Sequence, residues 1–224
     1  MIQGLIFDFD GLILDTETPI FQSWREIFEQ HGCAFTLKMW AECIGRSPDL
    51  YDRCDLLESC VGRPVDRAAI HRMQRQRESE LIDEQPLLPG VRQILEEAAR
   101  LELRRAIASS SSREWVSRYL KRFELVETFA VVRCADDVAQ AKPAPDLYLA
   151  VLEALALRAD EVIALEDSPN GVTAAKRAGI FCVAVPNALT SQLPLDHADL
   201  RLSTLDEISL ARLLEIVIAR QNRA

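Results

Sequence analysis

The spacing of apolar side chains changes along the chain and divides it into two kinds of segment. Between residues 18 and 82 the apolar residues recur at helical intervals, and no strand pattern interrupts them. From residue 91 onward, helical segments alternate with short apolar runs that are typical of buried strands. Regular alternation of helix and strand predicts a parallel sheet with helices on both of its faces.

Apolar spacing and capping residues together predict the individual elements. In the first region we expect helices over residues 18–31, 37–44, 48–61 and 67–82, with Thr36, Ser47 and Asp66 as their caps. Beyond residue 90 we expect helices over residues 91–101, 112–123, 145–157, 169–178 and 205–219. The expected strands there cover residues 104–109, 129–133, 162–165, 181–185 and 198–202.

The apolar residues 2–9 predict a further strand, which must join the same sheet. The helical region is then an insertion that follows the first strand. Pro86–Gly90, rich in proline and glycine, marks the return to the sheet. We therefore predict an α/β fold, a doubly wound parallel sheet with an inserted α-helical domain. Residues 1–16 and 88–224 would form the α/β domain, and residues 17–87 the helical one.

Two acidic residues stand at the end of the first predicted strand. Asp8 and Asp10 are two residues apart, so they lie on the same side of an extended chain, and Gly11 lets the backbone turn away. Packing does not call for carboxylates there, because an unpaired buried charge is costly. Open parallel sheets bind ligands at the carboxyl ends of their strands. We interpret the pair as functional, rather than as a turn residue and a solvent-facing acid.

Other polar groups follow three more of the predicted strands. The hydroxyls of residues 109–112 can donate to a bound anion, although helix capping alone would explain any single serine. Pro143 disfavours helix at Lys142 and so holds that lysine on an extended segment. Glu166 and Asp167 form a second acidic pair after the strand at 162–165. Parallel strands would bring all these groups to one edge of the sheet.

Carboxylates gathered at one edge repel one another and require a counter-ion. The candidate ligands contain no histidine or cysteine, and such oxygen ligands select a hard divalent cation, for which we expect Mg2+. The candidate ligands are Asp8, Asp10, Glu166 and Asp167. A metal ion, a lysine and a hydroxyl around a free carboxylate suit phosphoryl transfer.

Composition excludes several other functions. The net charge of -9 argues against nucleic acid or an anionic membrane as the main partner. The first residues lack a basic segment and an unbroken apolar run, so we expect a cytoplasmic protein. Neither a GxSxG nor a GxxxxGK motif is present, which excludes a serine hydrolase of that type and a nucleotide P-loop. The six cysteines have no zinc-type spacing, and we expect reduced, buried thiols.

Residues 8–17 read Asp-Phe-Asp-Gly-Leu-Ile-Leu-Asp-Thr-Glu. This segment resembles the first motif of the haloacid dehalogenase-like hydrolases, in particular the branch of small phosphatases and β-phosphoglucomutases. Ser109, Lys142 and the pair Glu166–Asp167 resemble the family's second, third and fourth motifs in the same order. The resemblance therefore covers nearly the whole chain.

The resemblance implies a role for each matched residue. Asp8 would be the nucleophile that forms an aspartyl-phosphate, and Asp10 would protonate the leaving oxygen and then activate water. Lys142 and Ser109 would hold the phosphoryl group, with Ser110 as the alternative in the neighbouring register. Asp167 would bind Mg2+ beside Asp8 and the backbone carbonyl of Asp10.

The inserted helices resemble the family's cap domain, which would close over the site and contact the substrate. Glu17 and Arg46 are the candidate contacts there. Phosphoglucomutase-like members carry a histidine shortly after the first motif, and the matching position here is Ile20, which disfavours a mutase. We therefore predict a Mg2+-dependent phosphatase of small phosphorylated metabolites, sugar phosphates or similar compounds, that acts as a monomer.

Three other functions compete with this prediction. A phosphomutase of the same fold is the first, and the missing histidine counts against it. A haloacid dehalogenase is the second, but Asp10 would have no role in displacing halide. A non-catalytic binding protein is the third. Loss of Asp8, Asp10 or Lys142 would have indicated it, and all three are present.

Overall fold

The computed structural model describes residues 1–43 and 52–221, and the chain divides into two compact units. The core unit comprises Met1–Leu14 and Leu87–Ala224, and the inserted unit comprises Asp15–Pro86. The predicted insertion, 17–87, starts two residues later and ends one residue later than the inserted unit.

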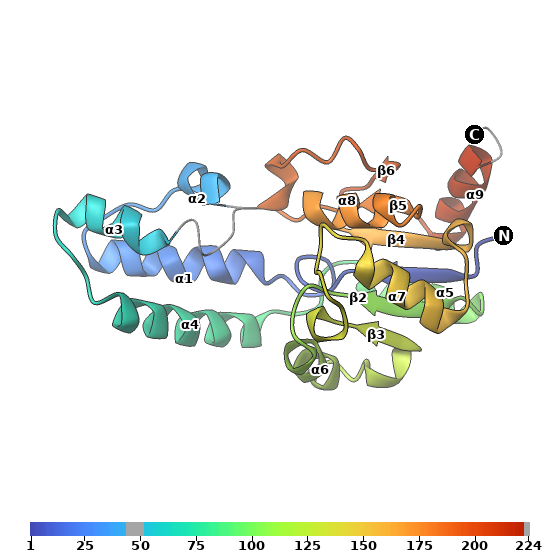
Figure 1. Ribbon diagram of the computed structural model, residues 1–224, viewed down its shortest axis with the longest axis horizontal. Helices are drawn as coiled ribbons and strands as arrows, with labels where there is room; N and C mark the ends of the chain where they lie inside the picture. The colour runs from blue at the N-terminus through green and yellow to red at the C-terminus, as the bar shows by residue number, and fades with distance from the viewer. Residues whose placement is uncertain (44–51, 222–224) are drawn as a thin grey trace. The chain divides into compact units, whose positions relative to one another are not determined.

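A six-stranded parallel sheet forms the centre of the core unit, with the strand order β3-β2-β1-β4-β5-β6 (Figure 1). Its strands are β1 (Gly4–Phe7), β2 (Arg104–Ala108), β3 (Val131–Arg133), β4 (Val162–Glu166), β5 (Phe181–Ala184) and β6 (Leu200–Arg201). β1 lies between β2 and β4, with Phe7 paired to Ile107 on one side and to Leu165 on the other. The parallel sheet was predicted, whereas its strand order could not be read from the sequence.

Helices cover the sheet on both faces. They are α5 (Val91–Arg100), α6 (Arg113–Arg122), α7 (Asp146–Leu155), α8 (Pro169–Arg177) and α9 (Leu210–Gln221). α7 and α8 bury Leu147 and Val172 against Ala106 and Ala164 of the strands. α5 and α6 belong to connections that run in the opposite direction along the sheet, and right-handed crossovers place them on the other face. Short 3-10 helices occupy Val126–Thr128, Ala135–Asp137, Ala159–Glu161 and Thr190–Gln192.

Some predicted boundaries were wrong. β1 is shorter than the predicted 2–9, although the backbone N–H of Asp8 still donates to the carbonyl of Leu165 at 3.0 Å. The last helix begins at Leu210 rather than 205. In the preceding segment the Thr204 hydroxyl donates to Asp206, and such local side-chain bonds compete with helix formation.

The inserted unit is helical, with α1 (Glu17–Gln30), α2 (Leu37–Cys43), α3 (Arg53–Val61) and α4 (Arg67–Glu84). α1 and α4 run side by side (Figure 1). Between them the side-chain amide of Gln74 donates to the hydroxyl of Ser23 at 3.0 Å, and both residues are buried. No helix among the described residues is long and apolar enough to cross a membrane.

Capping side chains define three helix starts in this unit. The hydroxyl of Thr36 accepts from the N–H of Met39 at 3.3 Å and begins α2, as predicted. Asp66 accepts from the N–H of Ala69 at 3.0 Å and begins α4, as predicted. Asp52 accepts from the N–H of Cys54 at 2.9 Å and caps α3. The predicted start at Ser47 and Pro48 lies outside the described residues.

The expectation that all six cysteines are reduced was wrong for two of them. Cys33, in the segment after α1, forms a disulfide with Cys60 near the end of α3. The partners are 27 residues apart in sequence, so no local pattern could indicate their pairing. Cys54, Cys134 and Cys182 are free and buried, as predicted.

Candidate active site

The two acidic pairs follow the neighbouring strands β1 and β4 at their carboxyl ends. Asp8 comes directly after β1, Glu166 is the last residue of β4, and Asp167 follows it. All three are buried, and each offers a carboxylate oxygen within 4.8 Å of the other two. The sheet therefore gathers three acidic groups in a small volume within the core unit.

Lys142 lies between two of these carboxylates, in a turn before α7. Its Nζ is 2.7 Å from Asp8 Oδ1 and 2.6 Å from Glu166 Oε1, and its side chain is 4% exposed. Burial alone would lower the pKa of Lys142, but the charges of Asp8 and Glu166 outweigh it and raise the pKa above its usual value. The lysine is therefore a buried cation that offsets part of the negative charge.

The two carboxylate oxygens of Glu166 differ in their partners. The hydroxyl of Tyr148 and Lys142 both bind its Oε1, whereas the buried Oε2 has no hydrogen-bond partner among the described residues. Burial raises the pKa of this carboxyl above its ordinary value. A Cβ at Gly171 would overlap the Glu166 carboxylate, so only glycine fits beneath it.

Asp167 is held by Asn187, a residue outside the predicted motifs. The side-chain amide of Asn187 donates to Asp167 Oδ2 at 3.1 Å and to the carbonyl of Gly11 at 3.3 Å. Gly11 has a φ of 78°, and a Cβ there would overlap the Asp167 carboxylate. Asn187 thus links the first motif to the fourth.

The donor atoms of this edge fit a hard cation. Asp8, Glu166 and Asp167 supply only oxygen atoms, and the unpaired Oε2 of Glu166 is a costly feature unless a positive partner meets it. Oxygen ligands without nitrogen or sulfur favour Mg2+ over softer ions.

Asp10 has its own, separate set of partners. Ser111 Oγ donates to Asp10 Oδ2 at 2.6 Å, Trp115 Nε1 donates to Oδ1 at 2.9 Å, and Ser109 Oγ lies 3.3 Å from Oδ2. Burial raises the pKa of Asp10 above its ordinary value, and the bond from Ser111 opposes this rise. Asp8 and Asp10, two residues apart, therefore lie in different electrostatic surroundings.

Alternate residues of the serine run 109–112 contact Asp10. Ser109 and Ser111 contact Asp10, whereas Ser110 is exposed and is not among the donors to that carboxylate. Residues two apart share a side of an extended chain, which accounts for the contact of Ser111 with Asp10 beside that of Ser109. Trp115 lies three residues beyond Ser112, the N-cap of α6, and nothing in the local sequence indicates its contact with Asp10.

Most of the predicted site residues lie together in the core unit: Asp8, Asp10, Ser109, Lys142, Glu166 and Asp167. Glu17 is the first residue of α1, in the inserted unit. Arg46 lies outside the described residues. The contacts that the sequence analysis did not foresee come from Ser111, Trp115, Tyr148 and Asn187.

Comparison with known proteins identifies the family. Residues 5–185 match the family described as haloacid dehalogenase-like hydrolase. "Putative phosphatase YhcW" of Bacillus subtilis is 41% identical over 96% of this chain and 97% of its own length. "Phosphorylated carbohydrates phosphatase" of Thermotoga maritima is 32% identical over 80% of this chain and 82% of its own.

A solved structure agrees with these matches. The crystal structure of a "putative beta-phosphoglucomutase" from Thermotoga maritima superimposes with a TM-score of 0.78 at 28% identity, covering 96% of this chain and 100% of that one. The chain therefore belongs to the haloacid dehalogenase-like hydrolases, in the branch that includes the phosphatases and the β-phosphoglucomutases. It is an enzyme of that family.

Proposed function

We propose that this haloacid dehalogenase-like phosphatase requires Mg2+ and hydrolyses small phosphorylated metabolites, sugar phosphates or similar compounds, through an aspartyl-phosphate on Asp8. One observation carries the proposal. Lys142 binds Asp8 and Glu166, while Asp10 is held by serine and tryptophan donors. These different partners support two different tasks for the neighbouring aspartates, nucleophile and acid–base group.

In the first step an oxygen of the Asp8 carboxylate attacks phosphorus. The bond from phosphorus to the substrate oxygen breaks, and the phosphoryl group passes to Asp8. The ammonium of Lys142, 2.7 Å from Asp8 Oδ1, lies close enough to offset negative charge on the transferring phosphoryl oxygens.

Asp10 supplies the proton that the leaving oxygen needs. Burial favours its protonated form, which suits a general acid. After the alcohol leaves, the Asp10 carboxylate takes a proton from water while that water attacks phosphorus. Inorganic phosphate then leaves, and Asp8 and the protonated Asp10 are both restored.

Asp8, Glu166 and Asp167 would hold the Mg2+ ion, with the backbone carbonyl of Asp10 as a further ligand by family resemblance. The bound ion supplies positive charge that offsets the phosphoryl oxygens. Tyr148 and Asn187 keep the ligands in place, because each donates to a carboxylate of the set.

A residue of α1 supports the proposal that water accepts the phosphoryl group. The position where phosphoglucomutase-like members carry a histidine is Ile20, whose aliphatic side chain cannot transfer a proton. A relative that is 32% identical is named for phosphorylated carbohydrates, which supports substrates of that class.

We propose further that the inserted unit acts as a cap that contacts the substrate, with Glu17 among its contacts. We also propose that the enzyme is a cytoplasmic monomer.

Release of inorganic phosphate from a panel of sugar phosphates and related metabolites, with and without Mg2+, tests the proposal. We expect release that depends on Mg2+ and yields one free sugar for each phosphate. Conversion of a sugar phosphate mainly to an isomeric sugar phosphate would show a mutase instead. A panel with no hydrolysed member at saturating Mg2+ would overturn the phosphatase proposal.

A further inference from the structure

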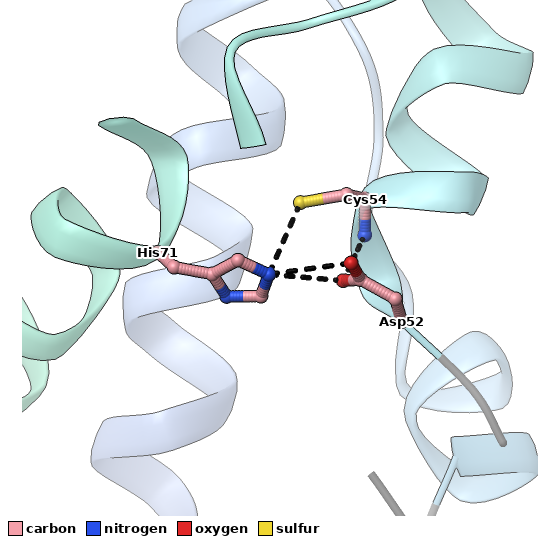
Figure 2. Close-up of side chains that lie close together, drawn as sticks. All are labelled: Asp52, Cys54 and His71. Carbon is pink, nitrogen blue, oxygen red and sulfur yellow. Dashed lines mark hydrogen bonds and ion pairs between the residues drawn. The ribbon is translucent and has the colours of Figure 1, made fainter. Parts of the chain in front are cut away.

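A second cluster of potential metal ligands lies within the inserted unit. Asp52 and Cys54 stand at the start of α3, and His71 lies on α4. The sulfur of Cys54 is 3.6 Å from His71 Nε2, and the Asp52 carboxylate oxygens are 3.2 and 3.3 Å from that same nitrogen. Figure 2 shows all three contacts meeting at Nε2.

This convergence on one nitrogen is not the geometry of a nucleophilic triad. In such a triad the thiol lies at one ring nitrogen and the orienting carboxylate at the other. Here sulfur and carboxylate both lie beside Nε2, whose single proton or lone pair points in one direction. A metal ion on that lone-pair axis would be near the nitrogen, the sulfur and an oxygen at once.

The spacing of the three donor atoms agrees with tetrahedral coordination. Zinc lies about 2.3 Å from cysteine sulfur and about 2.0–2.2 Å from histidine nitrogen and carboxylate oxygen, so ligand atoms in a tetrahedron are about 3.3–3.6 Å apart. The observed separations are 3.6 Å from sulfur to nitrogen and 3.2 Å from nitrogen to oxygen. The third separation, from the sulfur to an Asp52 oxygen, is within 4.8 Å.

The net charge around the cluster is negative, which favours binding of a divalent cation. Arg67 contacts Asp52 at 3.3 Å, but it also binds Asp55 and Glu58. Arg53, at the start of α3, is a second cation nearby, with its guanidinium 5.7 Å from the centroid of the Trp24 ring. Three carboxylates against two guanidinium groups leave a net charge of -1 with the histidine neutral. An ion can approach from the side of His71 and Asp52, whose side chains are 34% and 28% exposed, whereas Cys54 is buried.

The imidazole ring is also fixed in orientation. Trp24 of α1 packs edge-to-face against His71, with the ring centroids 5.7 Å apart. Asp52 is fixed as the N-cap of α3 through the N–H of Cys54. Two of the three donors are therefore oriented before an ion binds, which lowers the cost of binding.

We propose that Asp52, Cys54 and His71 form a binding site for Zn2+ or a similar borderline transition-metal ion, with water completing the coordination. Mixed oxygen, sulfur and nitrogen ligands select such ions over Mg2+. The ion joins the start of α3 to α4. The site is separate from the carboxylate cluster of the core unit and does not depend on the proposed phosphatase mechanism.

Cobalt binding to the full-length protein tests the proposal. Metal is first removed with a chelator, Mg2+ is added in excess to occupy the carboxylate cluster, and reductant is omitted so that Cys33 and Cys60 stay paired. Co2+ should then produce a thiolate-to-metal charge-transfer band that saturates at one equivalent and disappears when Zn2+ is added. Cys54→Ala should lose the band, whereas Cys182→Ala, which removes another buried free thiol, should keep it.

A second pair of variants separates ion binding from helix capping. Asparagine caps a helix about as well as aspartate, so Asp52→Asn removes mainly the charge. Asp66→Asn makes the same change at the cap of α4. We expect Asp52→Asn to weaken Zn2+ binding by about tenfold or more, since even outer-shell changes cost 10- to 100-fold. We expect Asp66→Asn to bind like wild type.

Three results would overturn the proposal: a wild-type protein without the band, a band that persists in Cys54→Ala, or equal Zn2+ affinity in the Asp52→Asn and Asp66→Asn variants. The wild-type titration and the asparagine pair decide the matter even if Cys54→Ala fails to fold.

Discussion

The two clusters of potential metal ligands differ in their donor atoms and in how the fold assembles them. In the core unit, oxygens from Asp8, Glu166 and Asp167 surround a buried lysine at the ends of adjacent parallel strands. In the inserted unit, oxygen, sulfur and nitrogen atoms from two helices meet at one imidazole. We infer that the first cluster selects a hard ion for chemistry and the second a borderline ion for structure.

The difference also explains why only one cluster could be anticipated. A parallel sheet brings the carboxyl ends of its strands to one edge whatever the details of packing, so motifs after strands can be placed together from sequence. Asp52 and His71 are joined only by the packing of α3 and α4, and no sequence spacing fixes that contact.

The largest expected effect comes from Asp8→Asn. An amide cannot attack phosphorus, so turnover should disappear while the fold and the cobalt band of the inserted unit remain. Phosphate release and the cobalt titration would be measured on the same preparation. Asp206→Asn, an exposed carboxylate of the core unit, is the control. Activity above about a tenth of wild type would contradict the nucleophile assignment.

Asp10→Asn should lower turnover by about 100- to 10,000-fold, the usual contribution of a positioned acid–base group. The Mg2+ requirement should stay nearly unchanged, because the proposed contact of Asp10 with the metal is its backbone carbonyl. Asp167→Asn should instead raise the Mg2+ concentration needed for half-maximal activity.

The turnover of Asp10→Asn with different leaving groups gives a second test of the acid–base role. An aryl phosphate hardly needs protonation to depart, so the loss in Asp10→Asn should be smaller for it while phosphorylation limits the rate. Full recovery of Asp10→Asn at saturating Mg2+ would mean that its side chain is a metal ligand and that another group transfers the proton.

Reduction of the Cys33–Cys60 disulfide should destabilise the inserted unit. A closed loop of this length contributes about 2–4 kcal/mol to the free energy of unfolding. Thermal unfolding followed by circular dichroism, with and without reductant, measures the effect. Cys33→Ala combined with Cys60→Ala should match the reduced protein and no longer respond to reductant. An unchanged midpoint in all four samples would exclude this contribution.

Trp115→Phe should have the smallest effect on catalysis. It removes one donor to Asp10, worth about 1 kcal/mol, so turnover should fall up to about tenfold with little change in KM. Ser111→Ala removes a second donor to Asp10 and should have a similar effect. Ser110→Ala removes no donor to Asp10 and should have a smaller effect. A larger loss for Ser110→Ala than for Ser111→Ala would favour the other register of the serine run.

Sequence patterns predicted the sheet, the helical insertion and the main residues of the carboxylate edge. Buried acidic residues are energetically costly at the ends of apolar strands unless they have a function. Asp8, Glu166 and Asp167 could therefore be recognised as candidate site residues. Tyr148 and Asn187 could not, because each reaches its carboxylate through tertiary packing. The disulfide was missed for the same reason, since Cys33 and Cys60 carry no local signal.

Chemical trapping of the enzyme during turnover tests the central proposal most directly. Borohydride reduces an acyl phosphate to an alcohol, so quenching the working enzyme with it converts a phosphorylated aspartate side chain to that of homoserine. We predict this product at Asp8, only when substrate and Mg2+ are both present, as read by mass spectrometry of the peptide containing residues 1–25. Phosphate release without any modified residue, or modification at Asp10 in place of Asp8, would contradict the account.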